Sequence, residues 1–121
     1  MFHSDLAKAF TRLLRLEQAL EHLNEAVSLS PTNPTTRLNR ARLYLKMGYS
    51  DLASTDFRYV SRLSPQTAKS LNQNGISLAH RGKTREAVEQ FLIAHSIDPG
   101  DISITQNLAN AYSEEGEEQK A

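Results

Sequence analysis

The chain contains no cysteine, and its charges cancel, with 14 Lys and Arg against 14 Asp and Glu. Without cysteine there is no disulfide, no thiolate zinc site and no cysteine nucleophile. A net charge of zero gives the molecule as a whole no attraction for nucleic acid or for an anionic membrane surface. We therefore expect neither nucleic acid nor a membrane as a partner.

Long apolar runs are missing as well. No stretch approaches the ~18 consecutive apolar residues of a membrane-spanning helix. The N-terminal sequence MFHSDLAKAF lacks the basic start and apolar run of a secretory signal peptide. A length of 121 residues leaves room for one small domain. We expect a single domain, residues 1–121, in the cytoplasm.

Signals of catalysis are equally scarce. The sequence contains no GxSxG motif, and GKT at 82–84 lacks the upstream glycine and strand of a phosphate-binding loop. No two histidines are three or four residues apart, the spacing that puts two metal ligands on one helix face. We therefore predict no enzymatic activity, no metal and no cofactor. The histidines are His3, His22, His80 and His95.

What the sequence does contain is an internal repeat with a period of 34 residues. Prolines, glycines and alanines all recur at this interval, which is hard to reach by chance. The period divides the chain into units 1–33, 34–67, 68–101 and a partial unit 102–121. The recurring residues are Pro31, Pro65 and Pro99; Gly48, Gly82 and Gly116; and Ala19, Ala53, Ala87 and Ala121.

Each unit is predicted to form two helices joined by a glycine turn. In the second unit, Tyr44 and Met47 belong to the first helix, and Gly48 tolerates the positive φ that the turn needs. Apolar residues at three- and four-residue spacing then predict the second helix, which ends at Ser64 because Pro65 follows. Small and large apolar residues alternate at fixed positions, as close helix packing requires.

This pattern resembles the tetratricopeptide repeat (TPR), which has the same period. QNLANAYSEEG at 106–116 is similar to the first helix of that family, and AVEQFLIAHSIDP at 87–99 to the second. The resemblance implies an all-α fold, a right-handed superhelical solenoid of three full repeats plus a terminal helix. The first unit departs from the family because Leu14 stands where glycine is expected, so one long helix is the alternative there.

The resemblance also implies a function, because the first helices of TPR arrays line a concave groove that binds peptides. Five basic and two acidic residues occupy the groove positions, a net charge of +3. Asparagine amides can pair with a peptide backbone, and Lys and Arg attract carboxylates. We expect a scaffold or adaptor that binds an extended, acidic peptide, although such charges also suit a solvated helix face. The expected site residues are Lys8, Arg12, Asn39, Arg42, Lys46, Lys69, Asn72, Gln73, Asn107 and Asn110.

Alternatives stay open for the partner. One TPR subfamily clamps the acidic C-terminal tails of heat-shock chaperones, and two of its five clamp residues are matched here. The five positions hold Ser4, Lys8, Asn39, Lys69 and Gln73. The groove could instead be apolar, centred on Leu38, Leu45 and Ile76. The chain could also be a regulatory TPR segment of a larger enzyme or of a secretion-system protein.

The last unit is a fourth copy cut short at Ala121, where a second helix would begin. We favour a fragment of a longer protein over a natural polar cap. In both cases the helix is expected to run from about Ile102 to Ser113, and residues after Gly116 to fray. This leaves an uncovered apolar edge that could drive self-association. The edge residues are Ile104, Leu108 and Tyr112.

Gly75 occupies the closest helix contact predicted in the third unit, where the other units have alanine. On helix propensity alone, Gly75→Ala is predicted to be neutral or stabilising by up to ~1 kcal/mol. Gly75→Leu is predicted to destabilise by about 1–3 kcal/mol through overpacking.

Overall fold

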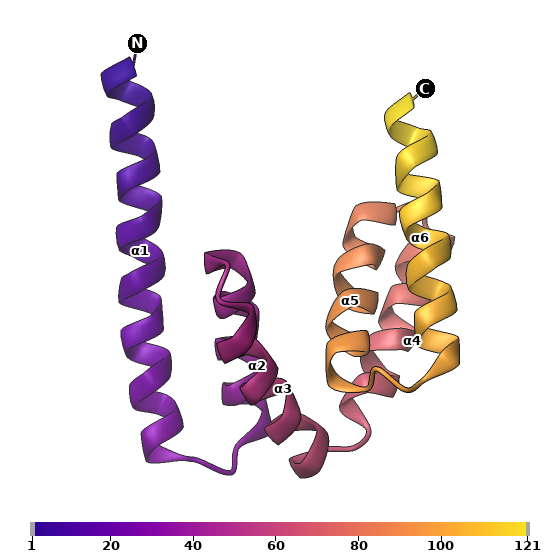
Figure 1. Ribbon diagram of the computed structural model, residues 1–121, viewed down its shortest axis with the longest axis horizontal. Coiled ribbons are helices and arrows are strands. Elements are labelled where there is room, and N and C mark those ends of the chain that lie inside the picture. Colours follow the sequence, from indigo (N-terminus) through magenta and orange to yellow (C-terminus); the bar gives the residue numbers. More distant parts are fainter. Residues whose placement is uncertain (1, 121) are drawn as a thin grey trace. The chain divides into compact units, whose positions relative to one another are not determined.

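The computed structural model describes the backbone of residues 2–120 and the side chains of residues 7–117. Its regular structure is helical throughout the described residues, and the prediction of an all-α helical-repeat fold is confirmed (Figure 1). None of these helices combines the length and hydrophobicity needed to traverse a lipid bilayer. The helices are α1 (Phe2–Leu29), α2 (Pro34–Met47), α3 (Ser50–Leu63), α4 (Thr67–His80), α5 (Thr84–Ile97) and α6 (Ile102–Lys120).

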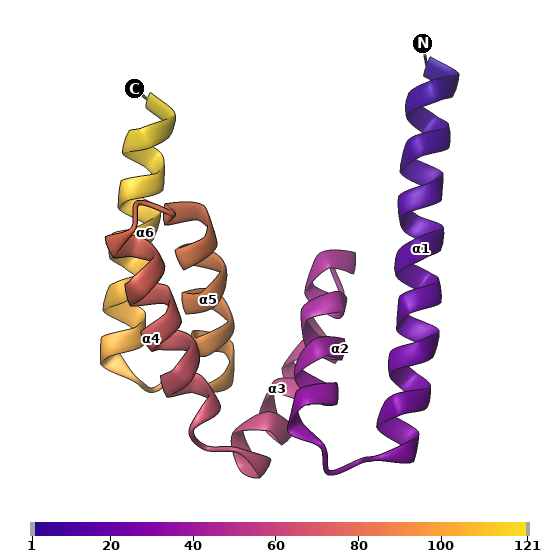
Figure 2. The same cartoon turned by 180° about the vertical axis from the view of Figure 1, so that it is seen from behind.

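Two compact units divide the chain within α3, at Tyr59 and Val60. In the first unit, α1 packs on α2. In the second unit, α4 packs on α5, α5 packs on α6, and α4 also touches α6 (Figure 2). The organisation of the chain as a single functional domain stays a prediction.

The glycine turns of the second and third repeats form as predicted. Gly48 has a φ of 83° and Gly82 a φ of 78°, values that favour glycine. In the first turn, the N–H of Tyr49 donates to the carbonyl of Tyr44 at 2.8 Å, and the second turn has the equivalent bond at 2.9 Å. This Schellman arrangement satisfies the last carbonyls of each helix and reverses the chain.

Side-chain caps fix the starts of two helices. The Asn33 side chain accepts from the N–H of Thr35 at 2.9 Å, and Pro34 occupies the first helical position of α2. At α6, Asp101 accepts from the N–H of Ile104 at 3.2 Å. These bonds satisfy N–H groups that no helical carbonyl can reach.

The first repeat does not form a helical pair. Residues 2–29 make one continuous helix of 28 residues, so the prediction of three helix-turn-helix repeats is wrong and the alternative of one long helix is confirmed. The cause lies at the expected turn, where Leu14, Arg15 and Leu16 are all good helix formers and no glycine is present.

The terminal helix is longer than predicted. α6 continues through Gly116 to Lys120, and Gly116 does not adopt a positive φ. A single glycine costs a helix roughly 1 kcal/mol relative to alanine, which is not enough by itself to end it. The predicted helix end near Ser113 is therefore wrong. Ala121 lies outside the described residues, so the choice between fragment and cap stays a prediction.

The terminal helix also buries two of the three residues that were predicted to lie at an uncovered edge. Ile104 and Leu108 are 0% and 9% exposed, and Leu108 and Ala111 pack against the apolar face of α5. The expectation that Ile104 and Leu108 lie uncovered is therefore wrong. Tyr112 is 48% exposed, because in the described chain no second helix follows α6 to cover it.

Candidate functional site

The groove positions of the first unit lie on α1 and α2. Lys8 and Arg12 are exposed on α1, where they border a shallow depression on one face of that helix. Asn39 and Lys46 are exposed on α2. Arg42 is half-buried, and its Nε is buried without a hydrogen-bond partner. Four of these five side chains are therefore accessible to a partner, whereas Arg42 is partly turned inward.

The groove positions of the second unit lie on α4 and α6. Lys69, Gln73 and Asn110 are exposed. Asn72 is buried and Asn107 half-buried, and Nδ2 of Asn107 donates to Oδ1 of Asn72 at 3.0 Å. The structure thus brings together two of the predicted amides from positions 35 residues apart.

An apolar hollow lies beside this amide pair, between α4 and α6, with α5 beneath it. It has a volume of about 130 Å³. At ~30 Å³ per water, this is the space of about four waters, or of one medium-sized side chain. We call it the α4–α6 hollow. It is lined by Ile76, Ala79, His80, Phe91, Asn107, Ala111 and Glu114.

Sequence reasoning found only part of the α4–α6 hollow. The sequence predicts Ile76 in an apolar groove and Asn107 in the peptide site, and both line the hollow. Phe91 comes from α5, the second helix of the repeat, and its buried ring packs against Gly75 of α4. The hollow also contains the acidic Glu114, so the positive charge expected for the groove does not extend into it.

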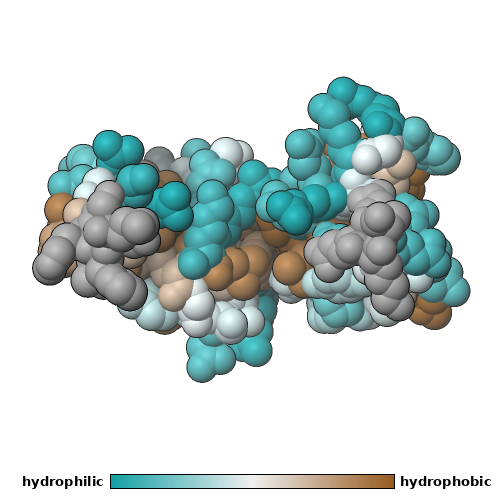
Figure 3. Space-filling view, turned by 90° about the horizontal axis from the view of Figure 1, so that it is seen from above, coloured by the Kyte–Doolittle hydropathy of each residue, from teal (hydrophilic) through white to brown (hydrophobic). Residues whose placement is uncertain are grey.

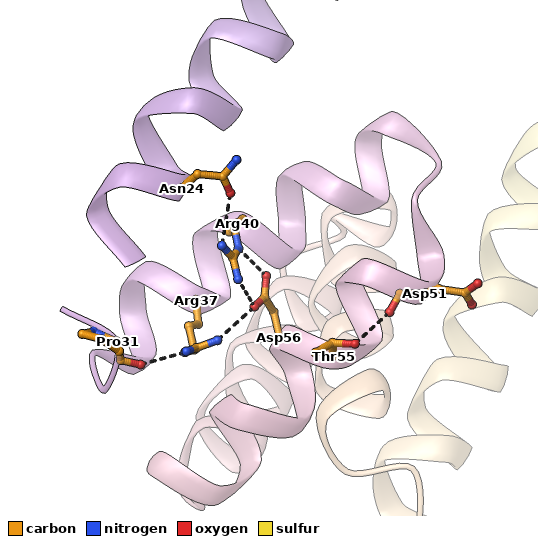
Figure 4. Close-up of polar contacts among 7 residues, drawn as sticks. All are labelled: Asn24, Pro31, Arg37, Arg40, Asp51, Thr55 and Asp56. Carbon is orange, nitrogen blue, oxygen red and sulfur yellow. Dashed lines mark hydrogen bonds and ion pairs between the residues drawn. The ribbon is translucent and has the colours of Figure 1, made fainter. Parts of the chain in front are cut away.

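A buried ionic cluster in the first unit was missed (Figure 4). Asp56 is 1% exposed and accepts two hydrogen bonds from Arg40, at 2.7 and 2.8 Å. Arg40 also donates to the Asn24 side chain at 3.1 Å, which connects α1, α2 and α3. The sequence did contain a signal for this cluster. Asp56 lies three residues after Ala53 and four before Val60, so a charged residue falls within the apolar stripe of the helix.

Arg37 completes the cluster. It donates to Asp56 at 3.4 Å and to the carbonyl of Pro31 at 2.8 Å, and its guanidinium lies 3.8 Å from the Tyr59 ring centre. The hydrogen bonds to Asp56 raise the pKa of Arg40, and partial burial opposes this rise. Arg40 therefore carries its positive charge at neutral pH. Because its partners are all within the chain, the cluster is structural and is not a free anion site.

No group of three or more His, Asp or Glu that could hold a metal lies within the described part of the chain. The clamp positions Lys8, Asn39, Lys69 and Gln73 are all exposed, but they are divided between the two units, and Ser4 lies outside the described side chains. The clamp, and a single groove that both units share, stay predictions.

Comparison with known proteins supports the repeat. A family model described as TPR repeat matches residues 7–48. Small glutamine-rich tetratricopeptide repeat-containing protein 2 of Mycosarcoma maydis is 30% identical over 91 residues, 75% of this chain and 26% of that protein. TPR repeat-containing thioredoxin TDX of Arabidopsis thaliana is 30% identical over 84 residues, 69% of this chain and 22% of that protein. The chain thus spans about a quarter of the length of these relatives.

Among solved structures, the second TPR domain of human RPAP3 in complex with an HSP70 peptide has a TM-score of 0.47. Its sequence is 23% identical, and the match covers 90% of this chain and 91% of that one. The Sgt2 TPR domain of Aspergillus fumigatus has a TM-score of 0.49 and 18% identity, covering 94% of this chain and 77% of that one.

Proposed function

Because the chain is a tetratricopeptide-repeat protein, we propose that it is a protein-interaction module that binds an extended, acidic segment of a partner. The proposal assigns it binding in place of catalysis, and an adaptor role in the cytoplasm. The observation that carries it is the α4–α6 hollow, which places an apolar floor next to the Asn72–Asn107 amide pair.

The α4–α6 hollow suits one aliphatic side chain of the partner. Ile76 and Phe91 supply apolar surface, and burial of an aliphatic side chain contributes about 1.5–3 kcal/mol. An amide group has two N–H donors and an oxygen with two lone pairs, so the bond between Asn107 and Asn72 leaves capacity for a peptide group of the partner. This combination favours an extended backbone with one apolar anchor.

The acidic residues of the partner are assigned to the other end of α4. Glu114 at the hollow repels a carboxylate, whereas Lys69 lies near the start of α4. At 1.5 Å per residue, Lys69 is about 16 Å along the helix from His80 at the hollow. We therefore place the apolar anchor at the hollow and the acidic residues toward Lys69. In the first unit, Lys8, Arg12 and Lys46 supply further positive charge.

Fluorescence anisotropy with a labelled peptide tests this proposal. The peptide carries one leucine and several Asp and Glu, and a second peptide has serine in place of the leucine. Asn107→Ala is expected to weaken binding by about 2- to 10-fold, the value of one hydrogen bond. Lys69→Glu is expected to weaken it by about tenfold at low salt and by less at high salt.

Arg85→Glu on α5 is the matched control, because Arg85 is exposed but lies outside the groove positions. It should leave the affinity for the acidic peptide unchanged. Equal affinities for acidic and basic peptides would refute the acidic partner. Equal affinities for the leucine and serine peptides would refute the role of the α4–α6 hollow. Binding that requires leucine but ignores ionic strength would favour the apolar groove.

A chaperone-tail clamp is the second candidate, favoured by the match of Asn39 and Lys69 to clamp positions. A clamp needs the free C-terminal carboxylate of its ligand, so amidation of the peptide should then abolish binding. Equal affinities for the free and the C-terminally amidated peptide would exclude the clamp. A regulatory segment of a larger enzyme is a third candidate, since one relative is a TPR repeat-containing thioredoxin and the chain spans 22% of it.

A further inference from the structure

The straight helix α1 keeps apart two segments that the other repeats fold together. In the second and third repeats a glycine turn brings the two helices side by side. In α1 the chain continues without a turn, so Ala7 and Leu23 are about 24 Å apart along the axis, at 1.5 Å per residue. The first half of α1 therefore cannot pack on the second half of the same helix.

The second half of α1 is incompletely covered as a result. Ala19 and Leu23 are half-buried. At the same repeat positions, Ala53 and Phe57 of the second repeat are 0% and 1% exposed. The third repeat also buries these positions almost completely. Packing on α2 thus covers one side of this segment of α1 and leaves another side accessible.

The first half of α1 also has apolar side chains that are exposed. Phe10 is 66% exposed, whereas Tyr44 at the same repeat position is 8% exposed. Leu13 and Leu14 are 48% and 45% exposed. Figure 3 shows hydrophobic atoms at the surface in several places, among hydrophilic ones. Both sides of one helix–helix interface are therefore accessible on the same helix.

The charges of the two halves are opposite. The first half of α1, residues 2–15, contains Lys8, Arg12 and Arg15 against one acidic residue, Asp5, a net charge of +2. Residues 16–29 contain Glu17, Glu21 and Glu25 and no Lys or Arg. Two α1 helices aligned in parallel place like charges together, whereas an antiparallel pair places each basic half on an acidic half.

We propose that two copies of this chain pair through antiparallel α1 helices, so that the first half of each α1 packs on the second half of the other. The pairing rebuilds between molecules the helical pair that other repeats form within one molecule, which is a domain swap. The third repeat gives its register, because Gly75 lies directly against the Phe91 ring. The matching positions in α1 are Ala7 and Leu23.

Disulfide cross-linking of mixed single-cysteine variants tests this register, and the chain has no other cysteine to interfere. Ala7→Cys mixed with Leu23→Cys should form a disulfide-linked dimer under mild oxidation. Ala7→Cys mixed with Gln18→Cys is the matched control and should not, because Gln18 is exposed and lies some 140° around the helix from Leu23. Self-linked Ala7→Cys would show a parallel pair and overturn the proposal. An intramolecular disulfide in the double variant would show a closed hairpin and also overturn it.

Sedimentation equilibrium across a concentration series tests the pairing without cysteine. The wild-type chain should reach the mass of two chains, compared with 13.5 kDa for one. Phe10→Glu should raise the dimer dissociation constant about tenfold or more, because it places a charge in the interface. Leu14→Gly should favour a closed hairpin and shift the mass toward one chain. A wild-type chain that stays monomeric at every concentration, or a dimer that Phe10→Glu leaves intact, overturns the proposal.

Discussion

The second and third repeats have the same helix–turn–helix arrangement but differ in the side chains that fill their interiors. Both consist of two helices of 14 residues joined by a turn with positive-φ glycine. In the second repeat, Asp56 is buried and bonded to Arg40. At the corresponding positions the third repeat has the uncharged Gln90 and Asn74, and its Gly75 lies against the Phe91 ring.

This difference shows what the repeat pattern determines. Turn residues and small apolar positions are common to both repeats, and they are sufficient for the same helical pair. The remaining interior positions vary: the second repeat has the bonded pair Arg40 and Asp56 where the third has uncharged residues, and it has Ala41 where the third has Gly75. Each solution depends on several residues together, so a substitution that one repeat tolerates should be costly in the other.

The largest expected effect comes from breaking the ionic cluster. Asp56→Ala should lower the free energy of unfolding by about 3–5 kcal/mol, because it leaves Arg37 and Arg40 largely buried without their carboxylate. Gln90→Ala, at the same position of the third repeat, should cost less than about 1 kcal/mol, because Gln90 is half-buried and uncharged. Urea denaturation followed by circular dichroism measures both. A loss below about 1 kcal/mol for Asp56→Ala would mean that the pair behaves like an exposed one.

Replacement of the whole cluster sharpens this result. A variant with Arg37→Leu, Arg40→Met and Asp56→Leu has no buried charge left unpaired. It should recover most of the stability that Asp56→Ala loses, since apolar replacements of buried ion pairs are often neutral or stabilising. If the triple variant is as unstable as Asp56→Ala, the cluster is required for the helix arrangement itself.

The second expected effect concerns Gly75. A Cβ there would lie 2.5 Å from the Phe91 ring, which is itself 2% exposed and cannot move away freely. Gly75→Ala should therefore destabilise by about 1–3 kcal/mol through overpacking, which corrects the expectation from helix propensity. Combination with Phe91→Leu should be less costly than the two single changes predict. Additive costs in a thermal-denaturation cycle would refute the contact.

The sequence predicted those features of the fold that depend on local chemistry. The period of 34 residues predicted the all-α repeat, and Gly48 and Gly82 predicted both turns. The prediction of a helical pair in the first repeat was wrong. Its apolar pattern fits one helix or two, and the absence of a turn residue favours one. The predicted end of α6 was wrong because Gly116 does not form a turn there. A single glycine is tolerated inside a helix.

The candidate site could be predicted only in part, for a different reason. Repeat positions assigned Asn72 and Asn107 to one face, and the structure joins them by a hydrogen bond. The α4–α6 hollow depends on how side chains of three helices pack together, among them Ile76, Phe91 and Ala111, which no helical periodicity reports. The Arg40–Asp56 bond pairs residues of two helices, and their long side chains could have reached several other partners.

A smaller effect is expected where the two repeats begin. The Asn33 side chain bonds the first turn of α2, whereas Gln66 at the start of α4 makes no side-chain cap. Asn33→Ala should cost about 1 kcal/mol, and Gln66→Ala should be close to neutral. Amide hydrogen exchange at Thr35 is the local measurement, since its N–H donates to Asn33. Unchanged exchange in Asn33→Ala would show that the cap contributes nothing.

The smallest expected effect comes from the ring beside the ionic cluster. The Arg37 guanidinium lies 3.8 Å from the centre of the Tyr59 ring, and the third repeat has Ile93 at the matching position. Tyr59→Ile should cost about 0.5–1 kcal/mol, because isoleucine keeps apolar contact but has no negative ring face. The cost of Tyr59→Ile should vanish in an Arg37→Leu background. The third repeat naturally has leucine, Leu71, at the position that corresponds to Arg37. A double-mutant cycle in urea separates this coupling from the hydrogen bonds of Arg37 to Pro31 and Asp56. Equal costs of Tyr59→Ile with and without Arg37 would show that the ring acts only through packing.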